Sequence, residues 1–230
     1  MTDELNNGNA SQTMLNIAII TLAALLLGGL LYYEKKEKQN GRLITKTVLS
    51  SLFILTAVVQ PHPICRYYHF VLLALAFCLA GDVLLALPQK KMFLFGLISF
   101  LCGHIFYIFA LFSVAQINRL TLAGSLIGLV ISGGIYLWLR PHLGSMQKPV
   151  LVYVIVITIM VCGAWSILGD SDIVRQGRII VFAGALSFYF SDLFVARDRF
   201  LKKEFLNRLI GLPMYYMGQF LLAFSVGLLK

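Results

Sequence analysis

The stretch Tyr67–Leu87, YYHFVLLALAFCLAGDVLLAL, is mostly apolar and carries a single acidic residue, Asp82. An α-helix that crosses a bilayer needs about 20 predominantly apolar residues, and this stretch meets that requirement. It lacks the strict alternation of apolar and polar residues that is typical of a membrane β-strand. The stretch therefore indicates a helical membrane protein, and the rest of the chain decides how many such helices are present.

The composition of the whole chain agrees with this interpretation. Hydrophobic residues make up 59% of the 230 residues, charged residues 13%, and the mean hydropathy is +0.85. These values lie outside the range of soluble globular proteins. Loops are short, so we predict an all-α bundle of eight transmembrane helices in one domain, residues 14–230, after a polar and loosely structured N-terminal tail, residues 1–13. The expected spans are residues 14–33, 43–60, 67–87, 92–115, 120–139, 149–168, 176–196 and 210–229.

Basic residues are concentrated on one side of these expected spans. Fourteen of the 19 Lys and Arg residues flank the loops that follow the first, third, fifth and seventh spans. By the positive-inside rule these loops face the cytoplasm and both termini face away from it, as in a multi-pass protein of a bacterial inner membrane. The net charge of +9 thus reflects topology and contact with anionic membrane lipids, and nucleic acid is not expected as a partner. The fourteen residues are Lys35, Lys36, Lys38, Arg42, Lys46, Lys90, Lys91, Arg140, Lys148, Arg197, Arg199, Lys202, Lys203 and Arg208.

A second apolar segment also contains an aspartate near its end. It spans residues 176–196, QGRIIVFAGALSFYFSDLFVA. Asp192 follows the small residue Ser191 as Asp82 follows Gly81, and each aspartate precedes three apolar residues and an alanine. A carboxylate at membrane depth is costly, so it usually faces a protein interior or a wet cavity and serves a function. Aligning the two aspartates overlays the third span on the seventh, which is compatible with two parallel four-helix halves.

The two aspartates are expected at similar depths. With a rise of 1.5 Å per helical residue, Asp82 lies roughly 7 Å and Asp192 roughly 6 Å from the cytoplasmic ends of their spans. They can therefore share a polar pocket that opens toward the cytoplasmic leaflet. Other polar side chains are expected to support this site, namely Lys46, His104, Tyr107, Tyr153, Ser191, Tyr215, Tyr216 and Gln219.

Each of these residues also has a plain structural interpretation. Tyrosines near helix ends are often interfacial, Lys46 can extend its amine to the membrane surface, and His104 can be an interhelical hydrogen-bonding residue. The aspartates can simply pair with Lys46. No metal site is expected, because His104 is the only deep histidine and the four cysteines form no close pair or zinc motif.

The polar positions belong to short strings whose order and spacing are informative. The strings are Gly81–Leu85; Gly96 and Gly103–His104 through to Tyr107; Tyr153 with Met160; Gly184–Phe188 and Ser191–Asp192 through to Ala196; and Tyr215–Tyr216 with Gln219. Together they resemble the lysoplasmalogenase family of membrane proteins, the YhhN-like family, over the chain from about residue 40 onward. Lys46 matches a basic position of that family, whereas Thr47 stands where proline is common.

This resemblance implies an eight-span enzyme that hydrolyses the vinyl ether bond of lysoplasmalogens. The products would be a fatty aldehyde and glycerophosphoethanolamine or glycerophosphocholine. A vinyl ether resists hydroxide, but protonation of its terminal alkene carbon gives an oxocarbenium ion that water traps. Two carboxyl groups can supply the proton and stabilise the cation, as in glycosidases. We therefore expect Asp82 and Asp192 to be the catalytic pair, without a metal or cofactor, and the sequence leaves open which of them is the acid.

Under this hypothesis the substrate is a lysophospholipid whose phosphate is held by Lys46 and the basic loops. His104, Tyr107, Tyr216 and Gln219 would orient water or hold protons. The alternatives are a proton-coupled transporter that uses the same aspartates and a lipid-binding or scaffold protein without turnover. Release of aldehyde by purified protein separates these classes. The sequence does not decide between a monomer and a homodimer.

Overall fold

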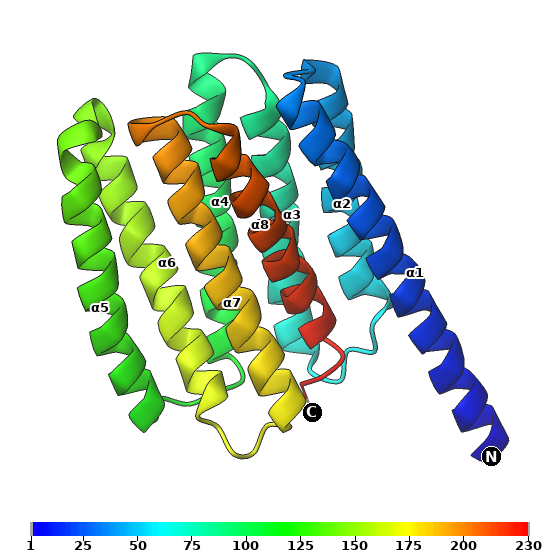
Figure 1. The fold of residues 1–230 in the computed structure, drawn as a ribbon. Helices are drawn as coiled ribbons and strands as arrows, with labels where there is room; N and C mark the ends of the chain where they lie inside the picture. The colour runs from blue at the N-terminus through cyan, green and yellow to red at the C-terminus, as the bar shows by residue number, and fades with distance from the viewer. Residues whose placement is uncertain (1, 230) are drawn as a thin grey trace.

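The computed structural model describes the backbone of residues 2–229 and the side chains of residues 10–89 and 91–229. Within this described part all regular structure is helical, and eight long α-helices run side by side (Figure 1). Two 3₁₀ turns precede α6 and a short π-helical segment follows α7. The elements are α1 (Thr2–Lys35), α2 (Gln39–Val59), α3 (Cys65–Ala86), α4 (Lys90–Phe112), α5 (Arg119–Leu139), η1 (Arg140–His142), η2 (Gly144–Met146), α6 (Gln147–Leu168), α7 (Arg175–Ala196), η3 (Arg197–Leu201) and α8 (Phe205–Ser225).

Seven of these helices, α1 to α7, are long and apolar enough to cross a membrane. The prediction of an all-helical, multi-pass integral membrane protein is thereby confirmed. The remaining helix, α8, has 21 residues but carries Asn207, Arg208 and Gln219, and this polarity separates it from the other seven. Eight membrane crossings therefore remain a prediction that depends on α8.

The helix boundaries lie close to the expected spans, with two informative differences. Helix α1 begins at Thr2, so the backbone of the polar residues 2–13, which we expected to be loosely structured, is helical and continuous with the first span. Helix α8 begins at Phe205, ahead of the expected start at residue 210, so Pro213 lies beyond the first turn of the helix. Proline has no backbone N–H, so it cannot donate to the carbonyl of Leu209 one turn earlier.

The loops after α1, α3, α5 and α7 lie at one end of the bundle, and both termini lie at the other (Figure 1). We call the first of these the basic end, because those loops and their flanking turns hold most of the Lys and Arg residues. Helix α8 packs against α7, α1, α2 and α3, whereas α4 packs against α3 and α6. Helix α5 packs on α6 and lies at the edge of the bundle (Figure 1).

Glycines allow two helix pairs to approach closely. A Cβ at Gly103 of α4 would lie 3.2 Å from the carbonyl oxygen of Ala74 in α3, and one at Gly218 of α8 would lie 2.9 Å from that of Gly184 in α7. Small residues at such crossings are a common means of close helix packing in membranes. The two tight pairs are α3–α4 and α7–α8, so each aspartate lies on a helix whose position is fixed by a close neighbour.

Candidate active site

Asp82 lies in a buried polar cluster formed by α2, α3 and α8. Its Oδ2 accepts hydrogen bonds from Ser50 Oγ at 2.6 Å and Tyr215 OH at 2.7 Å, and its Oδ1 lies 3.3 Å from Lys46 Nζ. Ser50 Oγ also lies 3.4 Å from Tyr216 OH. Asp82 is 1% exposed and Lys46 is 9% exposed. These five residues, the Asp82 cluster, bring together four of the predicted site residues and one that was not predicted.

The unpredicted member is Ser50, which is completely buried. Serines are common in membrane helices, so its identity alone carries no functional signal. The spacing does carry one, because Ser50 follows Lys46 by four residues and therefore lies on the same face of α2. The contact between Lys46 and Asp82 is the structural pairing that the sequence left open as an alternative.

Asp192 lies in a second cluster formed by α4, α6 and α7. Tyr153 donates a 2.7 Å hydrogen bond from its hydroxyl to Asp192 Oδ2, and His104 Nε2 lies 2.9 Å from that hydroxyl and 3.4 Å from the same Oδ2. His104 Nδ1 faces Met160 Sδ at 3.1 Å. His104 is fully buried, whereas the Asp192 side chain is 19% exposed. No described residue hydrogen-bonds Asp192 Oδ1.

The direction of the hydrogen bonds in this Asp192 cluster follows from the donors available. A phenol has one hydrogen to give, and Tyr153 directs it to Asp192. The oxygen of Tyr153 must therefore be the acceptor in its contact with His104, which places a hydrogen on Nε2 of the imidazole. His104 and Tyr153 thus form a short chain of donors that ends on one oxygen of Asp192.

The side chain of Phe188 on α7 lies between the two clusters. Its ring centroid is 4.4 Å from that of His104 in the Asp192 cluster and 5.4 Å from that of Tyr215 in the Asp82 cluster. Phe188 is completely buried. Among the described residues, Asp82 and Asp192 share no hydrogen-bonding partner. The polar residues that we expected in one pocket are therefore divided into two hydrogen-bonded groups joined by aromatic contacts.

The remaining predicted site residues lie outside both clusters. Tyr107 donates a 2.7 Å hydrogen bond to Gln219 Oε1, and both residues are completely buried. The Gln219 Nε2 atom is buried without a described partner. Ser191 is also buried, and its hydroxyl donates to the carbonyl of Phe188 on its own helix at 2.7 Å. Tyr107 and Gln219 thus form a third polar pair, whereas Ser191 bonds within α7.

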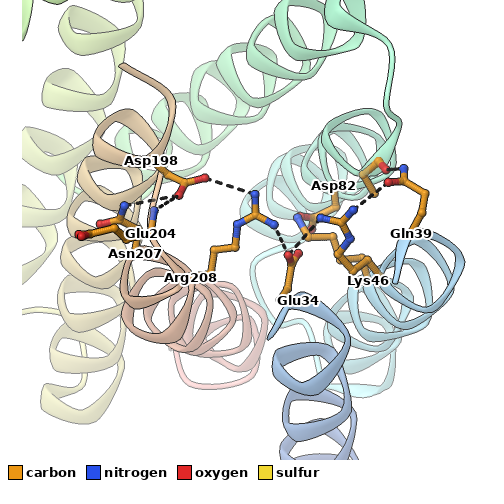
Figure 2. A network of polar contacts seen from close by, with 10 residues as sticks. Glu34, Gln39, Lys46, Asp82, Asp198, Glu204, Asn207 and Arg208 are labelled. Carbon is orange, nitrogen blue, oxygen red and sulfur yellow. Dashed lines mark hydrogen bonds and ion pairs between the residues drawn. The ribbon is translucent and has the colours of Figure 1, made fainter. Parts of the chain in front are cut away.

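A network of charges closes the Asp82 cluster from the basic end (Figure 2). Glu34 of α1 accepts contacts from Arg42 Nη1 at 3.4 Å and from Arg208, and Arg208 Nη2 also lies 3.3 Å from Asp198. Glu34 is 8% exposed. Arg42 precedes Lys46 by one turn of α2, so the network covers the face of α2 that leads to Asp82. None of these ion pairs was predicted. Glu34 and Arg208 lie 174 residues apart in the sequence, and the other two pairs each join residues on either side of a loop.

The fold and the site together define a class: a multi-pass helical membrane protein with two carboxylates held in separate interhelical clusters. No group of three or more His, Cys, Asp or Glu side chains able to hold a metal occurs among the described residues. A sequence profile of the YhhN family matches residues 41–226, which is most of the chain. The chain belongs to the YhhN family.

Curated relatives extend this result. The chain is 32% identical over 173 residues to proteins named lysoplasmalogenase from Mycobacterium bovis and Mycobacterium tuberculosis, an alignment that covers 73% of this chain and 62% of each relative. It is 29% identical over 160 residues to human lysoplasmalogenase TMEM86A, covering 67% of this chain and 64% of that protein. The chain thus spans less than two thirds of the length of these relatives. No solved structure is significantly similar to it.

Proposed function

We propose that this protein hydrolyses the vinyl ether bond of lysoplasmalogens, with Asp192 as the proton donor. Membership of the YhhN family and the names of the mycobacterial and mammalian relatives support this substrate class. The observation that carries the assignment of the acid is the unequal hydrogen bonding of the two carboxyl groups. Both oxygens of Asp82 accept contacts from protein donors, whereas one oxygen of Asp192 has no described partner.

Asp192 has the geometry of a general acid. Its Oδ2 is held by Tyr153, with His104 alongside, while Oδ1 is left for a proton and a substrate. The side chain is 19% exposed, so a ligand can reach it without unfolding of the bundle. A correctly placed acid of this kind contributes a factor of about 10² to 10⁴ in rate.

The proposed reaction is balanced without any further reagent. The hydrogen on Asp192 Oδ1 is transferred to the alkene carbon that bears the hydrocarbon chain, the one not bonded to the ether oxygen. The π electrons form the new C–H bond while the ether oxygen forms the oxocarbenium double bond. Water then attacks the oxocarbenium carbon and gives up a proton to the Asp192 carboxylate. The hemiacetal then breaks its bond to the glycerol oxygen, which takes up the hydrogen lost by the hemiacetal hydroxyl and leaves as an alcohol, and the aldehyde is released. Asp192 ends the cycle protonated, as it began.

Asp82 serves as a fixed acceptor in this scheme. Three donors on α2 and α8 direct their hydrogens at its two oxygens, so Asp82 is arranged to accept hydrogen bonds and to supply negative charge. Its charge would act on the developing cation through the aromatic wall formed by Phe188 and Tyr215. In a poorly hydrated interior such an effect extends further than in water. Direct contact with the substrate is not required for this role.

The topology completes the proposal. We place α8 as the eighth span, since it packs among α1, α2, α3 and α7, and we place the basic end in the cytoplasm of a bacterium. Both termini would then lie on the opposite side of the inner membrane. The active site would open in the cytoplasmic leaflet, where Asp82 and Asp192 lie about one turn from the ends of α3 and α7.

The test is aldehyde release by purified protein in detergent micelles. With 1-alkenyl-lysophosphatidylethanolamine as substrate we expect one fatty aldehyde for each glycerophosphoethanolamine formed. The saturated 1-alkyl analogue, which cannot form an oxocarbenium ion by protonation, should give none. Activity should persist in EDTA. Absence of aldehyde at all substrate concentrations would overturn the proposal.

The same experiment addresses the transporter alternative. Hydrolysis needs no sealed compartment, so micelles suffice for it, whereas coupled transport requires two compartments. The names of the relatives support hydrolysis. Substrate movement in vesicles without aldehyde release would favour transport by the same aspartates.

A further inference from the structure

A groove between α4 and α6 leads from the basic end of the bundle to the Asp192 cluster. It has a volume of about 310 Å³ and its apolar walls include Leu97 and Leu101 of α4 and Val152 of α6. Lys148 lies at one end of its α6 wall and Tyr153 at the other. Tyr153 is the residue that donates its hydrogen bond to Asp192, so the groove ends at the proposed proton donor.

The groove opens sideways, toward the surface that a membrane would cover. Ile98 on the α4 side is 46% exposed and Val152 on the α6 side is 49% exposed. In a multi-pass membrane protein such apolar exposed positions face the lipid chains. A ligand can therefore enter directly from the bilayer, with its hydrophobic part still in contact with lipid.

The groove is basic at one end and apolar along its walls, which matches the phosphate and the hydrocarbon chain of a phospholipid. Lys148 is exposed in the first turn of α6 and makes no ion pair with a described residue. It precedes Tyr153 by five residues, which is roughly 7.5 Å along the helix axis at 1.5 Å per residue. In a lysoplasmalogen, glycerol separates the phosphate from the vinyl ether oxygen by roughly 6 Å, given bonds of about 1.5 Å. A phosphate at Lys148 thus places the vinyl ether beside Tyr153 and Asp192.

The far end of the groove also leads to the catalytic side chains. Leu101 is followed three residues later on the same face of α4 by His104. His104 and Tyr153 are the two residues that hold Asp192 Oδ2. The groove wall and the polar cluster are thus consecutive parts of one surface, formed by the same two helices.

We propose that this groove is the substrate site, and that it binds one single-chain phospholipid that enters laterally from the leaflet at the basic end. Lys148 holds the phosphate, the glycerol runs along α6, and the hydrocarbon chain lies against Leu97 and Leu101 before it leaves between Ile98 and Val152. The volume is at the small end of ligand pockets and suits one chain. The identity of the reacting bond rests on the proposed function, but binding in the groove does not.

Photo-crosslinking tests the groove independently of turnover. The probe is a saturated 1-alkyl-lysophosphatidylethanolamine with a diazirine near the start of its chain, used with the full-length protein in micelles. We expect adducts on residues 94–101 of α4 and on Val152, suppressed by unlabelled lysophosphatidylethanolamine but not by diacyl phosphatidylethanolamine. Leu97→Trp, which fills the groove, should remove these adducts. The matched control is Leu55→Trp, in a second apolar groove of about 290 Å³ between α1 and α2, which should leave them unchanged.

Replacement of Lys148 tests the phosphate contact. Lys148→Gln should weaken competition by lysophosphatidylethanolamine by about 1.4- to fivefold, the range of an exposed ion pair. Competition by a 1-alkylglycerol, which has no phosphate, should not change. Lys35→Gln, an exposed lysine at the same end of the bundle on α1, is the control and should have no effect on either competitor.

The outcomes separate the groove from the reaction. Adducts spread over all lipid-facing helices and not competed by lysolipid would mean annular lipid only and would overturn the groove. Groove-specific adducts without aldehyde release would retain the lysolipid site and reject the proposed function. If the wild type releases aldehyde but the adducts that lysolipid suppresses lie only on other helices, the proposed function is retained and the groove is rejected as the substrate site.

Discussion

The ammonium of Lys46 lies 3.3 Å from Asp82 Oδ1 in an interior where both side chains are nearly inaccessible. Asp82→Asn removes the negative member and leaves a buried cation without a counterion. Loss of one partner of a buried ion pair costs about 3–5 kcal/mol. We therefore expect a large fall in the thermal unfolding temperature of the detergent-solubilised protein.

The companion variant Lys46→Met/Asp82→Asn separates charge from packing. Removing both charges leaves no uncompensated ion, so stability should return to within about 1 kcal/mol of wild type, because replacing both partners is often nearly neutral. Aldehyde release by both the single and the double variant should be lower than that of wild type, since the negative charge of Asp82 is absent. If the double variant is as unstable as Asp82→Asn alone, the pair is not what stabilises this region.

Asp192 should behave differently from Asp82, because its carboxyl group has fewer partners and is partly exposed. Asp192→Asn should lower kcat for aldehyde release by about 10² to 10⁴ while the unfolding temperature changes little. Tyr153→Phe removes one hydrogen bond to Asp192 and should reduce kcat less than Asp192→Asn does. Kinetics and thermal unfolding on the same preparations provide the measurement.

A matched tyrosine provides the control for this series. Tyr189 also lies on a membrane helix and its hydroxyl contacts Ser132 at 2.8 Å, away from both carboxylates. Tyr189→Phe removes the same number of atoms and should leave kcat unchanged. Equal losses from Tyr153→Phe and Tyr189→Phe would mean that the effect is structural.

The sequence was sufficient to predict the seven helices α1 to α7 as membrane spans, because length and apolarity alone define such a helix. It was less informative about α8. Tyr215, Tyr216 and Gln219 add polar groups to this helix. Their hydrogen-bond contacts with other helices offset the cost of burying those groups, and composition does not reveal these contacts. Helix α8 also begins at Phe205, ahead of the expected start at residue 210, and it contains Pro213.

The sequence predicted how far Asp82 and Asp192 lie from the ends of their helices, but not which neighbouring helices they face. The rise per residue gives depth, and Asp82 and Asp192 do lie about one turn from the basic ends of α3 and α7. The direction in which each side chain points depends on helix rotation and on the order of helices around the bundle. Asp82 faces α2 and α8 and Asp192 faces α4 and α6, with Phe188 between them. Hydrophobicity patterns contain no information about that order.

Glu34 connects α1 to the rest of the bundle, because it is shared by Arg42 of α2 and Arg208 of α8. Glu34→Gln would leave two neighbouring cations without their common counterion. Hydrogen bonds to charged groups contribute about 1.5–3 kcal/mol, so we expect destabilisation of that order. Hydrogen exchange should increase around residues 30–40. Added salt should reduce the difference from wild type, because it screens the repulsion between the arginines.

The control for this charge is Glu37→Gln. Glu37 is exposed and makes no ion pair with a described residue, and surface substitutions of this kind usually change stability by less than 0.5 kcal/mol. It removes the same charge three residues away, so it accounts for any general effect on the basic end. Equal destabilisation by both variants would argue against a specific role for Glu34.

Gly218 sets the distance between α8 and α7, and so the position of Asp192 relative to the tyrosines of α8. A Cβ at Gly218 would lie 2.9 Å from the carbonyl oxygen of Gly184 and 3.0 Å from the backbone nitrogen of Phe188. These are backbone atoms, so no side-chain rotation can relieve the contact and the helices must separate. Gly218→Ala should therefore destabilise the protein by about 1–3 kcal/mol. It should also lower aldehyde release, since Phe188 contacts both clusters.

Gly133→Ala is the matched control, because a Cβ at Gly133 in α5 has no atom within 4 Å. In that exposed helix alanine is the better helix former, by about 0.8–1 kcal/mol in aqueous hosts. We expect unchanged or slightly higher stability and unchanged activity. Thermal unfolding of both variants in the same detergent measures the contrast. If Gly218→Ala were as stable and active as Gly133→Ala, the close crossing of α7 and α8 would not be what holds the two clusters in place.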